Sequence, residues 1–408
     1  MARVSSKSSA AATPDPRLHF RKPLLETPFH ARTSALNLLN QWGAWGGYTT
    51  VLCYRDSAME HTAIRNAASV YDLCPMVKYR VTGPDAADYL NRLTVRNAAK
   101  LTPGGVHYTV WCDDQGKILD DGTLFRYGPD DYLICCQERH LPWLLDSAIG
   151  YDVAVREVTD EIAALSLQGP TTASVLGAAG FDVSGLKPFR MAAFDFEGGT
   201  LTISRTGFTG DLGYELWTTP DRALALWDRL FEAGAPYGIT PIGTDALNLA
   251  RIEAGFIITN MDFIPADQAL REDRARSPFE LGLEWMIDWD KGHFTGRRAL
   301  LAEKEKANWG WALVGLDIEG NIPVDGSLIY ANKTREVGYI TAACWSPTLK
   351  RNIAIAQVRR PQDTKGNLWV EVYALRELQY AKLMLKADVC PRPFFSPPRR
   401  RATPPDRF

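Results

Sequence analysis

A glycine-rich stretch at residues 205–216 holds the side chain best suited to binding chemistry, the carboxylate of Glu215. Residues 201–204 alternate as a strand does, the glycines that follow permit a tight reversal, and an extended pattern resumes at residues 214–217. A carboxylate fixed at a strand end offers two acceptor oxygens to a flat heterocycle with adjacent N–H donors, and a pterin has such an edge. The alternative is a glycine-rich hairpin with an exposed surface glutamate.

Two adjacent aspartates, Asp120 and Asp121, form a second candidate for chemistry, just past the turn-forming residues 113–116. Neighbouring side chains of a strand face opposite sides, so only one of the pair can point into a pocket. The alternative is an acidic pair that flanks a turn and is exposed to water. The six histidines lack the spacing of a metal site, which predicts that no metal is bound.

Aromatic residues provide candidate packing surfaces. Tyr108 is expected on a strand, half-buried at least, and Trp345 precedes a loop that carries two cations, Lys350 and Arg351. An apolar or cation-holding wall is predicted from four further aromatic residues, although core packing explains most of the 12 tryptophans: Trp42, Trp45, Trp111 and Phe208.

The composition is that of an ordinary globular protein of 408 residues, with 46 basic and 48 acidic side chains and a net charge of −2. This balance predicts no attraction to nucleic acid or to an anionic membrane, and no apolar run reaches the ~18 residues of a membrane helix. Seven scattered cysteines without a C-x-x-C pair indicate reduced thiols and a cytoplasmic location. The sequence predicts a flexible tail at residues 1–17 and a disordered or draped Pro/Arg-rich tail at residues 391–408.

The order of the expected elements indicates an α+β fold. Strands predicted at residues 77–82 and 163–168 each lead through a Gly-Pro pair into a helical pattern, which suggests a duplicated unit. Strands at 106–111, 123–127 and 132–136 form an expected meander, and helices follow at 220–234 and 243–254. Strands dominate from residue 311 onward, so a separate C-terminal β-barrel or jelly-roll-like lobe is expected.

Six short segments, taken together and in order, carry a family resemblance. The chain resembles the glycine-cleavage T-protein (aminomethyltransferase) and the tetrahydrofolate-dependent demethylases of the same superfamily over about residues 27 to 390. The segments that carry the resemblance are residues 60–72, 115–121, 205–216, 251–255, 278–283 and 346–350.

This resemblance implies a three-lobed cloverleaf around a central folate channel. It implies a first folate-binding α+β lobe at residues 18–72 plus 158–275, a second α+β lobe at 73–157, a connector at 276–310 and a C-terminal β lobe at 311–390.

The resemblance also implies roles for individual residues, with tetrahydrofolate as the cofactor. It places Asp121 beside the reactive folate nitrogens, where a carboxylate can orient a substrate amine or stabilise positive charge. Glu215 matches the glutamate that binds the pterin, Tyr108 matches a tyrosine near the folate, and Phe208 stands where the T-protein has a tyrosine. Trp345 could stack on the aminobenzoyl ring.

Three departures from the T-protein pattern guide the choice of reaction. Pro75, Phe208 and Leu247 stand where the T-protein carries a histidine, a tyrosine and an arginine, so polar groups are lost from the substrate side. We therefore predict a methyltransferase that demethylates a small N-, O- or S-methylated compound. The alternatives are an aminomethyltransferase that acts on a lipoyl carrier protein and a folate-binding regulatory protein without transfer chemistry. The sequence does not predict the oligomeric state.

Overall fold

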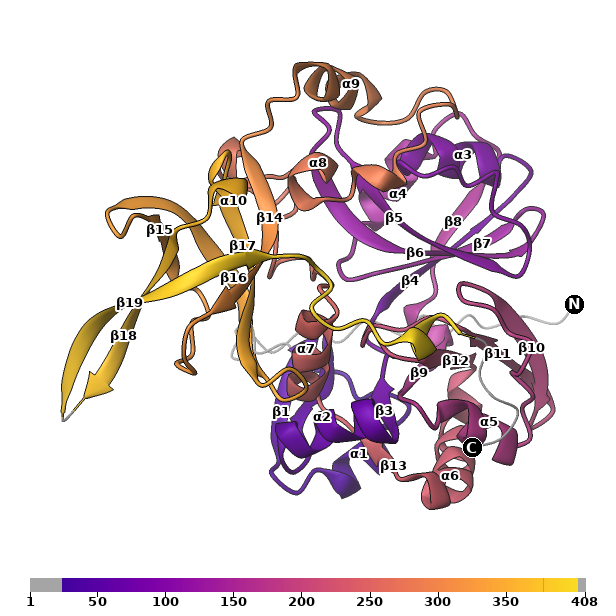
Figure 1. Cartoon of the computed structure of the whole chain (residues 1–408). Coiled ribbons are helices and arrows are strands. Elements are labelled where there is room, and N and C mark those ends of the chain that lie inside the picture. Colours follow the sequence, from indigo (N-terminus) through magenta and orange to yellow (C-terminus); the bar gives the residue numbers. More distant parts are fainter. Residues whose placement is uncertain (1–23, 377, 403–408) are drawn as a thin grey trace, which may run out of the picture.

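The computed structural model of the chain describes residues 24–376 and 378–402, which form an α+β structure of three lobes (Figure 1). Two lobes are each built on one mixed or antiparallel sheet with helices, and the third is a closed β-barrel. The predicted α+β cloverleaf with a C-terminal β lobe is therefore confirmed, and that lobe is a barrel. The tail predicted at residues 1–17 lies outside the described residues, as do residues 403–408.

Lobe 1, at the bottom of Figure 1, contains a six-stranded sheet in the order β10-β11-β12-β9-β3-β13. All its neighbours are antiparallel except β13, which pairs parallel with β3. The strands of this sheet are β3 (Ala68–Asp72), β9 (Ala163–Gln168), β10 (Met191–Phe196), β11 (Gly199–Ser204), β12 (Gly213–Thr218) and β13 (Ile239–Pro241). The first two strands of the lobe, β1 (Gln41–Trp45) and β2 (Tyr48–Cys53), form a separate hairpin. Its helices are α1 (His30–Leu36), α2 (Ser57–Asn66), α5 (Thr172–Ala178), α6 (Ala223–Gly234) and α7 (Thr244–Glu253).

Lobe 2 contains a five-stranded antiparallel sheet in the order β5-β6-β7-β4-β8. The meander expected from three predicted strands forms its β5-β6-β7 part, and the Gly-Pro entry expected after residue 82 leads into a helix. Its elements are β4 (Val77–Thr82), α3 (Ala86–Leu93), β5 (Gly105–Cys112), β6 (Ile118–Gly128), β7 (Asp131–Cys136), α4 (Leu141–Ser147) and β8 (Ala154–Glu157).

The barrel follows a connecting segment that contains the short helices α8 (Pro278–Leu281) and α9 (Arg297–Lys306). Its strands close in the order β14-β17-β16-β15-β18-β19, and the last two extend as a hairpin that projects from the barrel (Figure 1). The barrel elements are β14 (Trp311–Ile318), β15 (Leu328–Ala331), β16 (Arg335–Ser346), β17 (Arg351–Arg359), α10 (Gln362–Lys365), β18 (Leu368–Arg376) and β19 (Gln379–Cys390).

A buried cluster of charges around Glu253, at the end of α7, connects lobe 1 to the barrel. Glu253 is 0% exposed and accepts hydrogen bonds from Arg65 of α2 and from Ser346 and Thr348 of the barrel, and His61 Nε2 lies 3.1 Å from its Oε2. Burial alone would raise the pKa of this carboxyl, but hydrogen bonding to His61 and the charge of Arg65 lower it to about 2. Glu253 is therefore an ionised structural centre that joins lobe 1 to the barrel.

The C-terminal segment leaves the barrel and crosses lobe 1 beside β12 (Figure 1). Arg399 donates to both carboxylate oxygens of Asp211, at 2.6 and 2.8 Å, and the Phe395 ring lies under the Arg65 guanidinium at 4.7 Å. The described part of the Pro/Arg-rich tail is thus draped over lobe 1, and its arginines contact protein groups instead of only solvent.

Candidate functional site

Glu215 lies on β12, between β11 and β9, where the glycine-rich turn has just brought the chain back into the sheet. The Gln168 side chain of β9 fills the space beside this turn and donates to the carbonyls of Thr206 and Tyr214. A Cβ atom on Gly207 or Gly213 would lie 2.1 Å from Gln168 Oε1. A side chain at either position would therefore displace the Gln168 amide from its contacts with the turn.

The Glu215 carboxylate is buried, with 8% of the residue exposed, yet it lacks a cationic partner among residues 24–402. Its Oε2 accepts a hydrogen bond from the Thr206 hydroxyl. Burial raises the pKa of Glu215 to about 7, and the Thr206 hydrogen bond opposes this rise. A buried carboxylate without a cation is poised to accept hydrogen bonds from a ligand that supplies donors.

Asp121 lies on β6 of lobe 2 and is only partly buried. Its Oδ2 accepts from the Tyr108 hydroxyl at 2.8 Å, and its Oδ1 lies 2.8 Å from the Thr259 hydroxyl. Burial raises the pKa of Asp121 to about 7, and the negative charge of Asp120 adds to the rise. The structure thus brings together Tyr108 and Asp121, two residues predicted for the site.

Asp120, the preceding residue of β6, is 0% exposed. It accepts from the backbone N–H groups of Asp121 and Glu138, and His140 Nε2 lies 3.1 Å from its Oδ2. The expectation that only one member of the acidic pair is accessible is confirmed, because Asp120 is fully enclosed. Its role is to hold the strand and the loop after β7.

Glu215 of lobe 1 lies near Cys135 of lobe 2, on the sheet that also carries Asp121. Tyr108 and Cys135 flank Thr123 in the lobe 2 sheet, and alternation places Thr123 on the same side of β6 as Asp121. Burial raises the pKa of the Cys135 thiol to about 12, with a contribution from the negative charge of Glu215. We call this region of Tyr108, Asp121, Cys135 and Glu215 the junction.

An apolar wall lies next to the junction. Leu247 of α7 packs in one hydrophobic cluster with Cys135 and with residues from both lobes, including Trp45, Phe125 and Trp217. Phe125 and Trp217 meet edge to face with ring centroids 5.2 Å apart. Apolar side chains of both lobes therefore pack together on this side of the junction.

Phe208 lies at the glycine-rich turn and stacks on Phe256 with ring centroids 5.5 Å apart. The Arg400 guanidinium of the tail lies 5.1 Å from the Phe256 ring centroid. Phe208 is therefore part of a layer between the turn and the tail, beside the strand that carries Glu215.

Trp345 lies apart from the junction. Its neighbours on β16 face the other lobes, since Cys344 packs against residues of α7 and the connecting segment and Ser346 contacts Glu253. Trp345 is 45% exposed and lines an open groove of the barrel with residues that include Lys350 and Arg351. The structure does not bring Trp345 together with Glu215 or Asp121.

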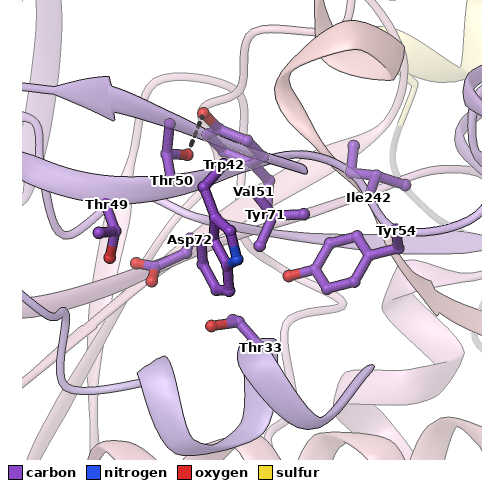
Figure 2. Close-up of a pocket in the computed structure, with 9 residues that line it drawn as sticks. All are labelled: Thr33, Trp42, Thr49, Thr50, Val51, Tyr54, Tyr71, Asp72 and Ile242. Carbon is purple, nitrogen blue, oxygen red and sulfur yellow. Dashed lines mark hydrogen bonds between the residues drawn. The ribbon is translucent and has the colours of Figure 1, made fainter. Parts of the chain in front are cut away.

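A separate small pocket lies inside lobe 1, among Trp42, Tyr54, Tyr71 and Asp72 (Figure 2). Figure 2 shows the Tyr71 hydroxyl beside Thr50, a contact of 3.4 Å. The Asp72 carboxyl already accepts from the Thr27 hydroxyl and from the backbone N–H of Cys74. This pocket shares no lining residue with the junction, and its polar groups serve the fold.

The sequence analysis missed Thr259, which contacts both aspartates from the loop after α7. No periodicity or motif distinguishes this residue in the sequence, because its role depends on contacts across 138 positions of chain.

In the described ranges, no group of three or more His, Cys, Asp or Glu side chains could hold a metal ion. Among the same residues, no helix is long and apolar enough to cross a membrane.

Comparisons with known proteins agree with this architecture. The family model described as the GCVT N-terminal domain matches residues 32–291, and that of the glycine cleavage T-protein C-terminal barrel domain matches residues 312–396. Aminomethyltransferases of Halothermothrix orenii and Bacillus subtilis are 34% and 30% identical to the chain. These alignments cover 78% and 89% of the chain and 88% and 99% of the relatives.

Two further relatives extend the comparison. Trimethylamine-oxide aldolase of Ruegeria pomeroyi is 34% identical over 85% of the chain, which spans 44% of that protein. The crystal structure of glycine cleavage system aminomethyltransferase T from Bartonella henselae matches with a TM-score of 0.80, at 23% identity, over 92% of this chain and 99% of that one, and shows the same fold. The expectation of an enzyme is confirmed: the chain belongs to the glycine cleavage T-protein family and is a one-carbon transferase of that folate-dependent family.

Proposed function

We propose that this protein transfers a methyl group from a small N-, O- or S-methylated compound to N5 of tetrahydrofolate. The observation that carries the proposal is the junction itself, where the buried Glu215 of lobe 1 and the partly buried Asp121 of lobe 2, both with a raised pKa, lie beside an apolar wall. Aminomethyl transfer requires polar groups that hold an amine, whereas Leu247 packs with Trp45, Phe125 and Trp217.

Glu215 fits the pterin edge of tetrahydrofolate. Its carboxylate is buried on a rigid central strand and has no cationic partner in the part of the chain that the structure describes. A ligand with adjacent N–H donors would satisfy both oxygens at once and would lower the pKa of Glu215 by stabilising its charged form. Phe208 would pack beside the same ligand, and Tyr108 would contact it from lobe 2.

Asp121 fits the role of a proton acceptor and substrate-positioning group. When bound, tetrahydrofolate would supply the N5 lone pair that forms the new bond to the methyl carbon, while the donor atom keeps its bonding electrons and the N5 proton departs. Asp121 has a pKa of about 7, so near neutral pH its carboxylate can take up a proton and release it again. The hydrogen bonds from Tyr108 and Thr259 hold the carboxylate in one orientation.

The apolar wall supports a methylated donor over an aminomethyl group. A hydrogen-bond partner missing from a buried polar group costs ~1–3 kcal/mol, so an amine placed against Leu247 and Trp45 would bind poorly. The name of the relative trimethylamine-oxide aldolase refers to a methylated amine oxide, which is consistent with an N-methylated substrate here.

Aminomethyltransferase activity is the second candidate, and it is favoured by the names of the relatives from Halothermothrix orenii and Bacillus subtilis. It would require a lipoyl carrier protein as partner and would release ammonia. The two functions share Glu215 and Asp121 and differ only in the group that is transferred.

The test is incubation of the protein with tetrahydrofolate and a panel of compounds that carry an isotopically labelled methyl group. We expect labelled 5-methyl-tetrahydrofolate by mass spectrometry for one class of donor. A matched reaction with Asp121→Asn, which keeps the side-chain shape, should form the product far more slowly. If no donor of the panel labels the folate while the protein binds tetrahydrofolate, the demethylase proposal is wrong.

A further inference from the structure

The Thr259 hydroxyl lies between the two adjacent carboxyls of β6. Its Oγ is 2.5 Å from Asp120 Oδ1 and 2.8 Å from Asp121 Oδ1, so both contacts are within hydrogen-bond distance. A threonine hydroxyl has one proton and can donate it to only one of these carboxyls at a time. If the second carboxyl is protonated, its own proton makes the hydrogen bond to the threonine. If it is ionised, that contact brings two oxygen atoms together with no hydrogen between them.

Asp120 is the member of the pair whose carboxyl is held by the larger number of protein contacts. It is fully buried and accepts from the N–H groups of Asp121 and Glu138 in addition to its contact with His140 Nε2. Hydrogen bonds from donors that cannot be deprotonated favour the charged form of a carboxylate. The edge-to-face contact of His140 with Trp111, at 5.8 Å between ring centroids, holds the imidazole in place.

Asp121 is the partly exposed member of the pair, so it is the one that can exchange a proton with solvent or a ligand. Other titratable groups lie around it. Tyr108 of β5 donates a hydrogen bond to it. Burial, and then both aspartates, raise the pKa of Cys136 of β7, and the charge of Arg392 in the C-terminal segment acts on Tyr108. Burial and the charge of Asp120 disfavour a second negative charge, while the hydrogen bonds from Tyr108 and Thr259 favour it.

We propose that Thr259 is a positioning residue that, held by Asp120, controls how readily Asp121 accepts a proton during one-carbon transfer. The role of Asp121 in transfer rests on the proposed function, whereas the control of its ionisation by Thr259 and Asp120 does not. When Asp121 is ionised, the Thr259 hydroxyl donates to it. When Asp121 is protonated, its proton points to Thr259 Oγ, and the threonine donates to Asp120.

Three substitutions separate this role from a packing role. Thr259→Val keeps the shape and removes the hydroxyl, so Asp121 loses a donor to its charged form and should titrate at a higher pH. Asp120→Asn removes the adjacent negative charge and should shift the titration of Asp121 to lower pH. Thr259→Ser retains the hydroxyl and is the matched control.

The experiment is a pH titration of the Asp121 carboxyl by 13C NMR, in the full chain labelled at aspartate, without folate or substrate. The resonance is assigned by its absence in Asp121→Asn. We expect the midpoint to rise by about one pH unit in Thr259→Val, which is a tenfold change in proton affinity. It should fall by at least as much in Asp120→Asn. In Thr259→Ser it should stay near the wild-type value. Should Asp120→Asn fail to fold, the two threonine variants decide the question.

A midpoint that is unchanged in a folded Thr259→Val protein overturns the proposal, as does an equal shift in Thr259→Ser. The acidic limb of the pH profile of kcat/KM for methyl transfer should move with the NMR midpoint in each variant. Absence of any methyl transfer would refute the proposed function, yet the titration would still show whether Thr259 controls Asp121.

Discussion

Replacement of Glu215 by glutamine should stabilise the protein without ligand and at the same time weaken its binding of folate. Glu215 is buried and has no cation nearby, so the folded protein holds its proton up to a pH of about 7, against a usual pKa of 4.5. A group whose folded pKa is raised contributes stability that is fully present below pH 4.5 and is lost as the pH rises through 7.

The magnitude follows from that difference in pKa. Between 4.5 and about 7, at ~1.4 kcal/mol per pH unit, the wild type loses about 3 kcal/mol of stability that the Glu215→Gln variant keeps. The two proteins should therefore be about equally stable at pH 4.5, and the variant should be more stable by about 3 kcal/mol at pH 8. Glutamine offers one acceptor oxygen in place of two and carries no charge, so the free energy of tetrahydrofolate binding should weaken by ~2–4 kcal/mol.

Urea unfolding at the two pH values measures the first effect, and titration calorimetry with tetrahydrofolate measures the second. A stability difference that is the same at both pH values would show that Glu215 is not a buried unpaired carboxyl. Unchanged folate affinity in a folded variant would remove Glu215 from the pterin site.

Three other predictions concern the remaining charges. Asp121→Asn should bind tetrahydrofolate within about tenfold of wild type and transfer the one-carbon group ~10²-fold more slowly in stopped-flow or quench assays, whereas a rate near wild type would exclude a role for its charge. Glu253→Gln should lower the free energy of unfolding at pH 7 by about 3 kcal/mol, because the pKa of Glu253 in the folded protein is about 2. The difference in unfolding free energy between variant and wild type, measured with urea, should shrink as the pH falls from 4.5 toward 2. Arg399→Ala should release the tail from Asp211, so limited proteolysis should cut after residue 390 several-fold faster, and equal cutting rates would mean that this ion pair does not hold the tail.

Local patterns predicted the elements that carry the site. Residues 163–168 and 77–82 form strands with the expected bounds. The first is a mostly apolar run, the second alternates with period two, and each ends at a Gly-Pro pair. The alternation of side chains along β6 implied different surroundings for Asp120 and Asp121, and only Asp121 is partly exposed, although both carboxyls contact Thr259. These features depend on a few neighbouring residues and can be read from the sequence.

Contacts between distant segments could not be predicted in this way. Thr259 meets Asp121 across 138 positions of chain, and Arg399 meets Asp211 across 188. The orientation of Trp345 depends on which face of β16 the other lobes cover, and a single strand does not reveal that. Resemblance to a family supplied the lobes, but not the partners of individual side chains.

The most direct measurement of the central claim compares the two possible transfers in one set of reactions. The protein and tetrahydrofolate are supplied with an aminomethylated lipoyl carrier in one arm and with methylated small molecules in the other. Ammonia, methylene-tetrahydrofolate and 5-methyl-tetrahydrofolate are quantified in both. The apolar wall at Leu247 predicts 5-methyl-tetrahydrofolate from a small methylated donor and no ammonia from the carrier. Turnover of the carrier at ordinary enzyme rates, ~1 s⁻¹ or faster, with release of ammonia would contradict the demethylase account and establish an aminomethyltransferase.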